Sequence, residues 1–402
     1  MPDIALLALP PDAWGSYWGS RHHMLTGLAA WFHVLWVDPP QHWRTSWRPS
    51  RRSAPPGGAP PGTPGFTRHV SPRWLPHVHR PAGLSRKIDR ARWLRAREVL
   101  ARRGCCRIVL DLWRPHYAPA LDAVPHDLSV YHITDEYTYA EQERPIDPQE
   151  RALISRVDQV FILSRSSFEK KARYNPHSLF LPNGVDYEAF ATPRPEPRDL
   201  ASIPRPRIGY VGYVKKHLDF GLLLALAERH REWSFVLVGP DGTLGEGAAL
   251  ARRVRALPNV HSLGGKPRED LPAYDQHIDV GVLCYASNGY TKFVNPLKLR
   301  EYLAAGRPVV GTPLASFEEF REVMEVARTP EQWSDAIARA LEPAASSPAR
   351  IEVRRRVARR YDWALLVDRM AQTLCERLGG ASIERFEALR VVSGRPVEGA
   401  LR

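Results

Sequence analysis

The sequence predicts an α/β protein built from two doubly wound domains, each with a parallel sheet and flanking helices. Three observations support this class. Short apolar runs alternate with helical patterns up to about residue 190, a proline-rich stretch follows, and the same alternation restarts at residue 207. Ligands of such sheets bind at the carboxyl ends of the strands, so we expect these ends to line a cleft between the domains.

The first half, residues 1–190, alternates strands and helices in order along the chain. The predicted strands are DIALLAL, HVLWVDPP, RIVLDL, LSVYHITDEY, DQVFILS and HSLFLPNGV. The predicted helices are GSRHHMLTGLAAWF, LSRKIDRARWLRAREVLARRG, PQERALISRV and RSSFEKKARYN, and Ser164 is expected to cap the last one. Residues 44–81 are rich in proline and glycine, which predicts a long surface loop with FTRHV as a short strand inside it.

The second half begins after the clearest linker signal in the chain. Residues 191–206 contain five prolines, and we expect them to form an interdomain hinge. The domain that follows, residues 207–378, is predicted to hold the strands RIGYVGYV, SFVLVGP, NVHSLGG, DVGVLC and RPVVGTP, with helices between them and at its C-terminal end. The tail, residues 379–402, is expected to be weakly structured.

Composition excludes several classes of protein. The net charge is +13 over 402 residues, but 44 acidic residues are dispersed among the basic ones, so we expect no nucleic-acid partner. The basic helix at residues 86–103 is a candidate face for anionic lipid. The four cysteines show no zinc spacing. With no basic signal-peptide region and no apolar run of membrane-spanning length, we expect a cytoplasmic protein that can lie on the inner face of the membrane.

The stretch NPLKLREYLAAG carries the most specific chemistry. Asn295 and Pro296 precede a helix that places Lys298 and Glu301 three positions apart on one side. A lysine at a helix start opposes the helix dipole, so a bound anion would explain it better than the helix does. A glutamate can accept hydrogen bonds from two adjacent hydroxyls, as a ribose offers. A surface salt bridge is the alternative.

A glycine turn at the start of the second domain is a second candidate. RIGYVGYVKKHLDF ends a strand in Gly209 and Gly212, and Lys215 and Lys216 follow before the next helix. Glycines at a strand–helix turn let backbone N–H groups approach an anion. The spacing differs from the dinucleotide-binding fingerprint, and a plain turn with two exposed lysines is the alternative.

The strand LSVYHITDEY supplies candidate catalytic residues in the first domain. His132, Asp135 and Glu136 are predicted to project from the carboxyl end of this strand, where catalytic groups gather. A structural histidine is the alternative.

Three further residues are candidates for the acceptor site or the cleft. Arg21 and His22 lie at the first strand–helix junction, where the alternative is a solvated helix face, and Asn183 lies in an Asn-Gly turn before the expected hinge. A structural role at the domain junction is the alternative for Asn183.

Four stretches in order resemble one enzyme family: LPNGVDYEAF, RIGYVGYVKKHLDFGLLLALAE, FVLVGP and PLKLREYLAAGRPVVGT. The sequence is similar to the retaining nucleotide-sugar glycosyltransferases with two Rossmann-like domains (GT-B), of the family 4 or group 1 type, and especially to the teichuronic-acid and exopolysaccharide branch. Three positions depart from the family pattern. Phe293 stands where an acidic residue is usual, eight positions before Glu301, and Tyr213 and Leu218 replace a common arginine and lysine.

The resemblance implies a nucleoside-diphosphate sugar donor and a glycan or lipid-linked acceptor. Glu301 would hold the ribose hydroxyls, whereas Lys298, the Gly212 loop and Lys215 or Lys216 would face the diphosphate. His132 or Asp135 would lie near the transferred sugar. No cofactor or metal is expected. A sugar-nucleotide epimerase of the same shape and a binding protein without transferase activity are the rivals.

Overall fold

The described part of the chain forms two compact units. The computed structural model describes residues 3–15, 18–40, 63–78, 80–136, 144–289 and 291–392. The first unit holds the described residues of Met1–Thr138, Pro145–Pro182 and Ala364–Arg402, and the second consists mainly of Asn183–Trp363. The boundary therefore differs from the expected one, and residues 364–378, expected as a C-terminal helix of the second domain, belong to the first unit.

The first unit contains a fully parallel seven-stranded sheet with the order β3-β2-β1-β4-β5-β6-β7. All six residues of β1 are buried, as expected for a strand covered on both faces. The strands are β1 (Ile4–Leu9), β2 (His33–Val37), β3 (Phe66–His69), β4 (Arg107–Leu112), β5 (Leu128–Ile133), β6 (Gln159–Ile162) and β7 (Ser178–Phe180). Its helices are α1 (Ser20–Leu28), α3 (Ala82–Ala101), α4 (Ala120–Ala123), α5 (Pro148–Arg156), α6 (Arg165–Lys171), α15 (Trp363–Leu378) and α16 (Ala381–Val392).

Most predicted elements of the first half are confirmed. The short strand FTRHV is β3, and Ser164 caps α6 by accepting a hydrogen bond from the backbone N–H of Ser167. Residues 44–62 of the expected loop lie outside the described residues. No helix in the described ranges is both long and apolar enough to cross a membrane.

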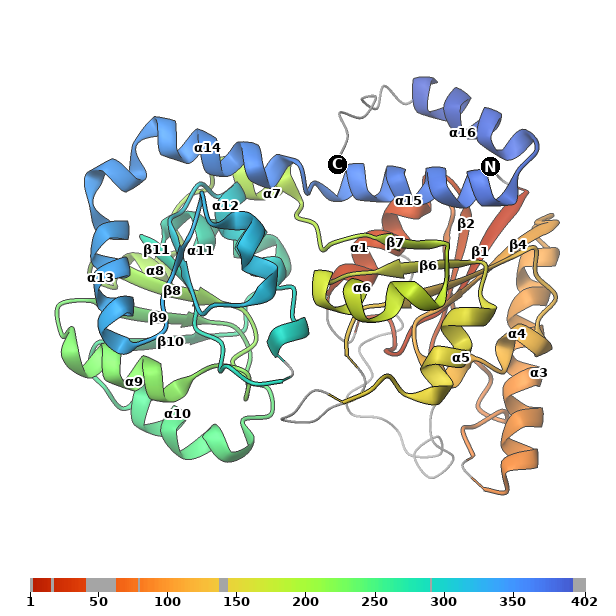
Figure 1. Ribbon diagram of the computed structural model, residues 1–402, viewed down its shortest axis with the longest axis horizontal. Coiled ribbons are helices and arrows are strands. Elements are labelled where there is room, and N and C mark those ends of the chain that lie inside the picture. The colour runs from red at the N-terminus through yellow and green to blue at the C-terminus, as the bar shows by residue number, and fades with distance from the viewer. Residues whose placement is uncertain are drawn as a thin grey trace. The chain divides into compact units, whose positions relative to one another are not determined.

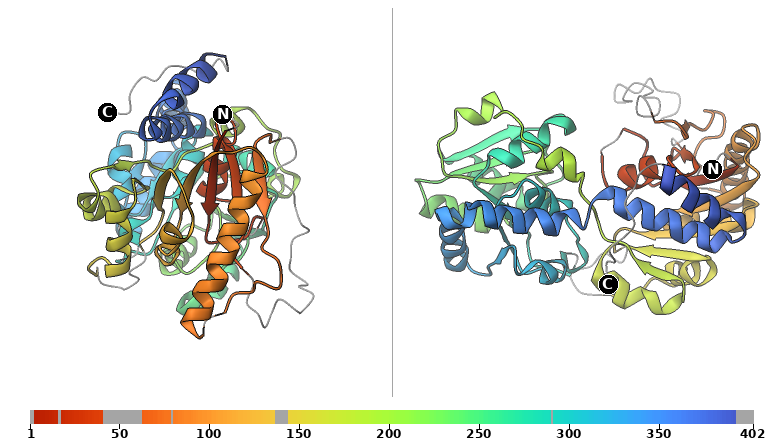
Figure 2. Two further views of the ribbon diagram at one scale, coloured as in Figure 1. Left: turned by 90° about the vertical axis from the view of Figure 1, so that its right-hand side faces the viewer. Right: turned by 90° about the horizontal axis from the view of Figure 1, so that it is seen from above.

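The expectation of a weakly structured tail is wrong for residues 381–392, which form α16. Figures 1 and 2 show α16 folded back beside α15. Phe386 packs on Trp31 with ring centroids 4.6 Å apart, and Arg385 forms an ion pair of 2.5 Å with Asp3. Residues 393–402 lie outside the described residues.

The second unit contains a parallel six-stranded sheet with the order β10-β9-β8-β11-β12-β13. Its strands are β8 (Arg207–Val211), β9 (Ser234–Val238), β10 (Val260–Gly264), β11 (Val280–Leu283), β12 (Val309–Gly311) and β13 (Glu325–Val326). Its helices are α7 (Tyr187–Ala191), α8 (Arg198–Ala201), α9 (Phe220–Arg229), α10 (Ala248–Arg255), α11 (Leu271–His277), α12 (Leu297–Ala304), α13 (Pro330–Leu341) and α14 (Pro348–Arg359). Figure 1 shows α9 and α10 on one face of this sheet and α11 and α12 on the other.

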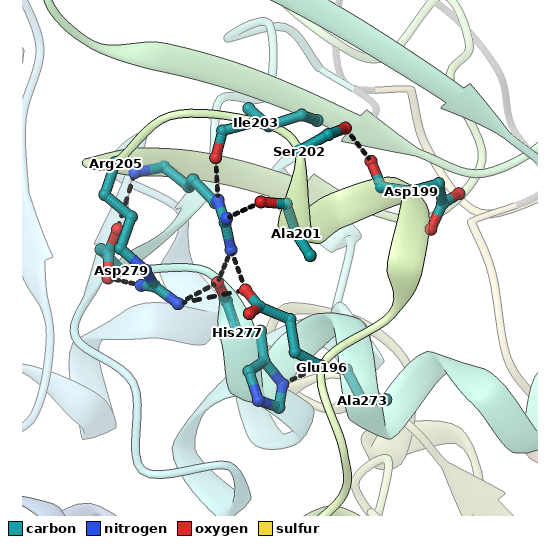
Figure 3. Close-up of polar contacts among 10 residues, drawn as sticks. Glu196, Asp199, Ala201, Ser202, Ile203, Arg205, Ala273, His277 and Asp279 are labelled. Atoms are coloured by element: carbon teal, nitrogen blue, oxygen red, sulfur yellow. Dashed lines mark hydrogen bonds and ion pairs between the residues drawn. The ribbon is translucent and has the colours of Figure 1, made fainter.

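The proline-rich segment 191–206, expected as the interdomain linker, lies within the second unit and is anchored to it. Arg205 forms ion pairs with Asp279 and Glu196, and Arg207 also pairs with Glu196 and donates to the carbonyl of Ile203 at 2.8 Å (Figure 3). Earlier in the segment, the carboxylate of Asp199 accepts hydrogen bonds from the side chains of Lys266 and Tyr274. The prolines remove backbone N–H donors, and these side-chain contacts attach the segment to the sheet instead.

Candidate functional site

The topology of the second sheet determines where a ligand can bind. Its strand order reverses between β8 and β11, because the chain first builds outward from β8 to β10 and then returns to the other side of β8. Ligands of open parallel sheets bind at such a switch point, beyond the carboxyl ends of the strands. Gly212 follows β8 directly, so it lies at this point.

Two glycines allow close packing at this switch point. The backbone φ angle of Gly212 is +152°, and that of Gly239, just after β9, is +147°. A Cβ atom at Gly239 would lie 2.1 Å from the carbonyl oxygen of Gly212. Only residues without a side chain permit this approach of the two strand ends.

Lys298 reaches the glycine turn from α12. A Cβ atom at Gly212 would lie 1.6 Å from Cε and 2.3 Å from Nζ of Lys298, so the lysine ammonium occupies the space that a side chain at 212 would fill. Pro296 is the residue that precedes the first helical residue, Leu297. Lys298 and the Gly212 turn are therefore in contact, and their joint role at a diphosphate stays a prediction.

Glu301 lies one helical turn after Lys298 and is partly buried. Burial raises the pKa of its carboxyl, whereas the positive charges of Lys298 and Arg268 oppose this rise. Arg268 also forms a long ion pair of 3.9 Å with Asp186. A carboxylate so placed beside two cations can accept hydrogen bonds from hydroxyl groups.

Buried contacts fix the loop that leads into α12. Asn295 accepts a hydrogen bond of 2.7 Å from the fully buried Arg300, and its backbone carbonyl accepts one of 2.5 Å from the side chain of Asn183. Asn183 was expected near the acceptor or the cleft, and the structure places it beside this loop of the second unit. Phe293 is 5% exposed and apolar, so this position cannot supply the acidic group of the family pattern.

Lys215 and Lys216 lie on the same β8–α9 connection as Gly212, and both are exposed. The backbone N–H of Lys216 donates to Thr243, which joins this connection to the loop after β9. Burial first, and then the charges of these two lysines, lower the pKa of His217 to about 4. At neutral pH the two lysines of this connection are positively charged and the His217 ring is neutral.

Sequence reasoning missed Asp275 on α11. Its side chain is fully buried, and neither carboxylate oxygen has a hydrogen-bond partner within the described residues. Burial raises the pKa of Asp275 well above its usual range, the charge of Glu301 raises it further, and that of Lys298 opposes the rise. Only the packing of α11 against α12 brings Asp275 to this place, and no pattern in the sequence signals it.

The structure contradicts the predicted exposure of His132. This residue lies inside β5 and is 1% exposed, stacked on Trp113 at 4.2 Å and with Nε2 3.3 Å from the carboxylate of Asp111. Burial lowers the pKa of His132 to about 3, so its ring is neutral at neutral pH. These contacts favour a structural histidine, and the catalytic role of His132 stays a prediction.

The other candidates of the first unit are distributed around the switch point of the first sheet, between β1 and β4. Asp135 follows β5 and lies 4.0 Å from Arg114, which follows β4. Arg21 is buried at the start of α1 in an ion pair of 2.7 Å with Asp12. Neither Arg21 nor its neighbour His22 lies on a solvated helix face, so that alternative is wrong.

His22 belongs to an aromatic cluster. It is fully buried, its ring lies about 5 Å from those of Trp14, Trp18 and Trp36, and its Nδ1 accepts a hydrogen bond of 3.2 Å from Gly19. Arg21 and His22 therefore order the β1–α1 connection.

Glu136 is likewise buried, in ion pairs with Lys170 and Lys171. In the described part of the chain, no group of three or more His, Cys, Asp or Glu side chains is arranged to hold a metal ion.

Comparison with known proteins agrees with this geometry. Residues 205–343 match the family model for glycosyl transferases group 1. The chain is 35% identical over 190 residues to TuaH of Bacillus subtilis (strain 168), which is named as a teichuronic acid biosynthesis glycosyltransferase. This match covers 46% of the chain and 47% of TuaH, so it spans about half the length of that relative.

Solved structures share the architecture over most of the chain. HepE of Anabaena, in complex with UDP-glucose, matches with a TM-score of 0.61 and 16% identity, over 92% of this chain and 98% of that one. The trehalose-6-phosphate synthase OtsA matches with a TM-score of 0.63 and 13% identity, again over 92% and 98%. At these identities the likeness shows the fold alone. The expected resemblance is confirmed: residues 205–343 match the family model for group 1 glycosyl transferases, and the chain has the GT-B fold of two Rossmann-like domains.

Proposed function

We propose that this chain is a glycosyltransferase that transfers a sugar from a UDP- or GDP-sugar to a glycan, glycolipid or other acceptor. The observation that carries the proposal is the position of Lys298 over Gly212, at the switch point of the second sheet, with Glu301 one turn further along α12. This arrangement offers a cation to a diphosphate and a carboxylate to a ribose. HepE, solved with UDP-glucose, and TuaH support the same class of reaction.

The energetic problem of this reaction is the negative charge that develops on the leaving diphosphate. Lys298 and the exposed Lys215 and Lys216 would stabilise that charge as fixed positive groups, which need no rearrangement during the reaction. The sugar carbon exchanges its bond to the phosphate oxygen for one to the acceptor hydroxyl, and the hydroxyl proton passes to the leaving phosphate. Retention of configuration is inferred from the family resemblance. We expect transfer to persist in excess chelator, since the lysines take the place of a metal.

Nucleotide binding tests the proposal directly. A ligand at 100 times its dissociation constant should raise the free energy of unfolding by about 2.7 kcal/mol, which a thermal-shift assay detects. We expect UDP or GDP to give such a shift and adenosine to give none. If neither diphosphate shifts the melting temperature, the chain does not bind a nucleotide donor.

Glu301→Ala tests the ribose contact. We expect it to weaken binding of UDP or GDP about a hundredfold or more, because two hydrogen bonds to a charged acceptor are lost at about 1.5–3 kcal/mol each. The variant should remain folded, because Glu301 is only partly buried. Isothermal titration of both proteins measures the effect, and equal affinities would remove Glu301 from the ribose site.

The two rival functions predict different products. An epimerase would convert the donor sugar without an acceptor, whereas a binding protein, suggested by Phe293 and Tyr213, would bind the donor and leave it intact. Product analysis with the donor alone and with added lipid-linked glycan acceptors separates the three cases. Nucleotide release that requires an acceptor supports the transferase.

We further propose that the chain is cytoplasmic and contacts an anionic membrane through the first unit. The exposed fractions of Trp74 and Leu84 are 65% and 46%, and Arg86, Lys87 and Arg90 on α3 are also exposed. Aromatic and basic side chains together suit an anionic headgroup layer. The protein should sediment with phosphatidylglycerol vesicles at low salt and not with phosphatidylcholine vesicles. Steep salt-dependent retention on DNA or RNA would instead indicate a nucleic-acid partner.

A further inference from the structure

Arg300 carries a positive charge into the core of the second unit. It lies on α12 and is 0% exposed, and its Nε and Nη2 atoms donate no hydrogen bond within the described residues. The carboxylate that pairs with it, that of Glu319, lies 3.8 Å from Nη2, and the Glu319 side chain is 37% exposed. Replacing such a buried ion by an apolar side chain of similar volume is often neutral or stabilising. Stability alone therefore does not explain this arginine.

Two aromatic rings contact the guanidinium group of Arg300. Its central carbon lies 4.5 Å from the ring centre of Tyr361 and 5.0 Å from that of Phe320. A planar guanidinium suits such a stacked site better than the ammonium of a lysine. Phe320 ends the 3₁₀ helix Ala315–Phe320, and Tyr361 follows α14. Two elements outside α12 therefore set the direction in which the remaining N–H groups of Arg300 point.

The guanidinium reaches back to the turn before α12, which consists of Asn295 and Pro296. Nη1 donates a hydrogen bond of 2.7 Å to the side-chain oxygen of Asn295 and a longer one of 3.4 Å to the carbonyl of Pro296. The side chain of Asn183 donates to the backbone carbonyl of Asn295 at 2.5 Å. Asn295 is thus held both by its side chain and by its backbone, and the chain enters α12 along a fixed path.

The turn before α12 sets the position of the two residues proposed to bind the donor. Lys298 is the second residue of α12 and Glu301 is the fifth, so both lie within about a turn and a half of the helix start. The first N–H groups of a helix have no partner inside it, and a side-chain cap usually holds them. Pro296 at the N-cap position of α12 provides no such cap. The contacts of Arg300 therefore replace a cap in fixing this helix start.

We propose that Arg300 is a positioning residue of the donor site: it holds the turn before α12 and so fixes where Lys298 and Glu301 lie. The proposal rests on the donor role proposed for Lys298 and Glu301 above. Without the guanidinium the turn samples several positions, and only a fraction of the molecules holds the lysine where a diphosphate can bind. The measured affinity for the nucleotide falls by that fraction.

Arg300→Met tests the proposal, because methionine fills a similar space without a hydrogen-bond donor. Isothermal titration with UDP and GDP should show an affinity about tenfold below that of wild type, as expected if about one molecule in ten keeps the competent turn. The melting temperature should stay within about 3 °C of wild type, since no buried charge is left unpaired. The matched control Arg354→Met removes another buried arginine, which donates at 3.2 Å to the carbonyl of Gly306, beyond the other end of α12. It should bind nucleotide as wild type does.

A role in stability alone gives the opposite pattern. A lower melting temperature of Arg300→Met with wild-type affinity in the folded protein would overturn the proposal. Arg300→Lys keeps the charge but lacks the planar fork, so it should bind about threefold more weakly than wild type. If Arg300→Met does not fold, wild-type affinity of Arg300→Lys overturns the proposal.

A second measurement needs no nucleotide. Hydrogen exchange in peptides that cover residues 291–303 should be about tenfold faster in Arg300→Met than in wild type, whereas exchange in α9 should be unchanged. Equal exchange rates in residues 291–303 would overturn the proposal. If wild type binds neither UDP nor GDP but this difference in exchange is seen, the donor assignment fails and the role of Arg300 at the turn does not.

Discussion

Alanine at position 212 is expected to displace Lys298 from the proposed donor site. The added Cβ atom would lie 1.6 Å from Lys298 Cε, far inside van der Waals contact, while the backbone φ angle of +152° itself favours glycine. Because the colliding atoms are the end of a flexible side chain, the lysine moves and the fold survives. The strained backbone costs on the order of 1–3 kcal/mol of stability.

The loss in binding follows from the lysine contact. A hydrogen bond between a charged lysine and a phosphate contributes about 1.5–3 kcal/mol. Gly212→Ala should therefore weaken UDP or GDP binding by about ten- to a hundredfold, and Lys298→Met should have a similar effect. If Gly212→Ala acts through Lys298, the double variant should bind no more weakly than either single variant. Isothermal titration of the four proteins gives the coupling free energy, and thermal unfolding confirms that each is folded.

Gly264→Ala is the matched control for the backbone cost. Gly264 ends β10 with a φ angle of +68°, and a Cβ atom there would meet nothing within 4 Å. This variant should lose stability as Gly212→Ala does and should bind nucleotide as wild type does. Strictly additive effects of Gly212→Ala and Lys298→Met would refute the reasoning, because they would mean that the glycine and the lysine act separately.

Two further predictions concern stability. Between pH 6.5 and 3 the unfolded chain binds a proton on His132 that the folded chain, with its pKa of about 3, does not, so wild type should lose about 1.4 kcal/mol per pH unit below pH 6.5. Urea unfolding at pH 7 and pH 5 should show this loss in wild type and a smaller one in His132→Gln, and equal slopes would contradict a buried neutral ring. Gly281→Ala should destabilise the second unit by about 1–3 kcal/mol, since its Cβ would lie 2.6 Å from the ring of Tyr302. Chemical denaturation measures this effect, and an unchanged midpoint would show that Tyr302 can shift.

The strands and most helices were predictable because their signals are local. Apolar runs such as IALLAL and SFVLV are too short for helices and are bounded by turns, so buried strands were the natural interpretation. The attachment of the proline-rich segment 191–206 to the second unit was not predicted, because composition cannot reveal the partners of Arg205 and Asp199. The tail misled for the same reason, since α16 is held by contacts to residues more than 350 positions away in sequence, such as Arg385 to Asp3.

The residues of the proposed donor site were predictable as neighbours where they lie close together in the sequence. Lys298 and Glu301 are three positions apart, and their helix follows a strand end, so their neighbourhood follows from helix geometry. The approach of Lys298 to Gly212 needed the topology of the sheet, which the alternation of elements implied. Asp275 could not be found, because its importance comes from being buried and unpaired, and burial depends on how α11 packs. His132 misled since a residue near the end of a strand can point into the core as well as out of it.

Most of the second unit is one continuous stretch, Asn183–Trp363, whose two ends are tied together. The backbone N–H of Trp363 donates to the carbonyl of Val185 at 3.0 Å, and Val185 pairs with Asp362 as an isolated bridge. In the sequence, residues 183–363 are an insertion between two segments that both belong to the first unit. The proposed donor specificity could therefore be exchanged between relatives by replacing this one segment, with both junctions at neighbouring points, while every residue of the first unit is kept.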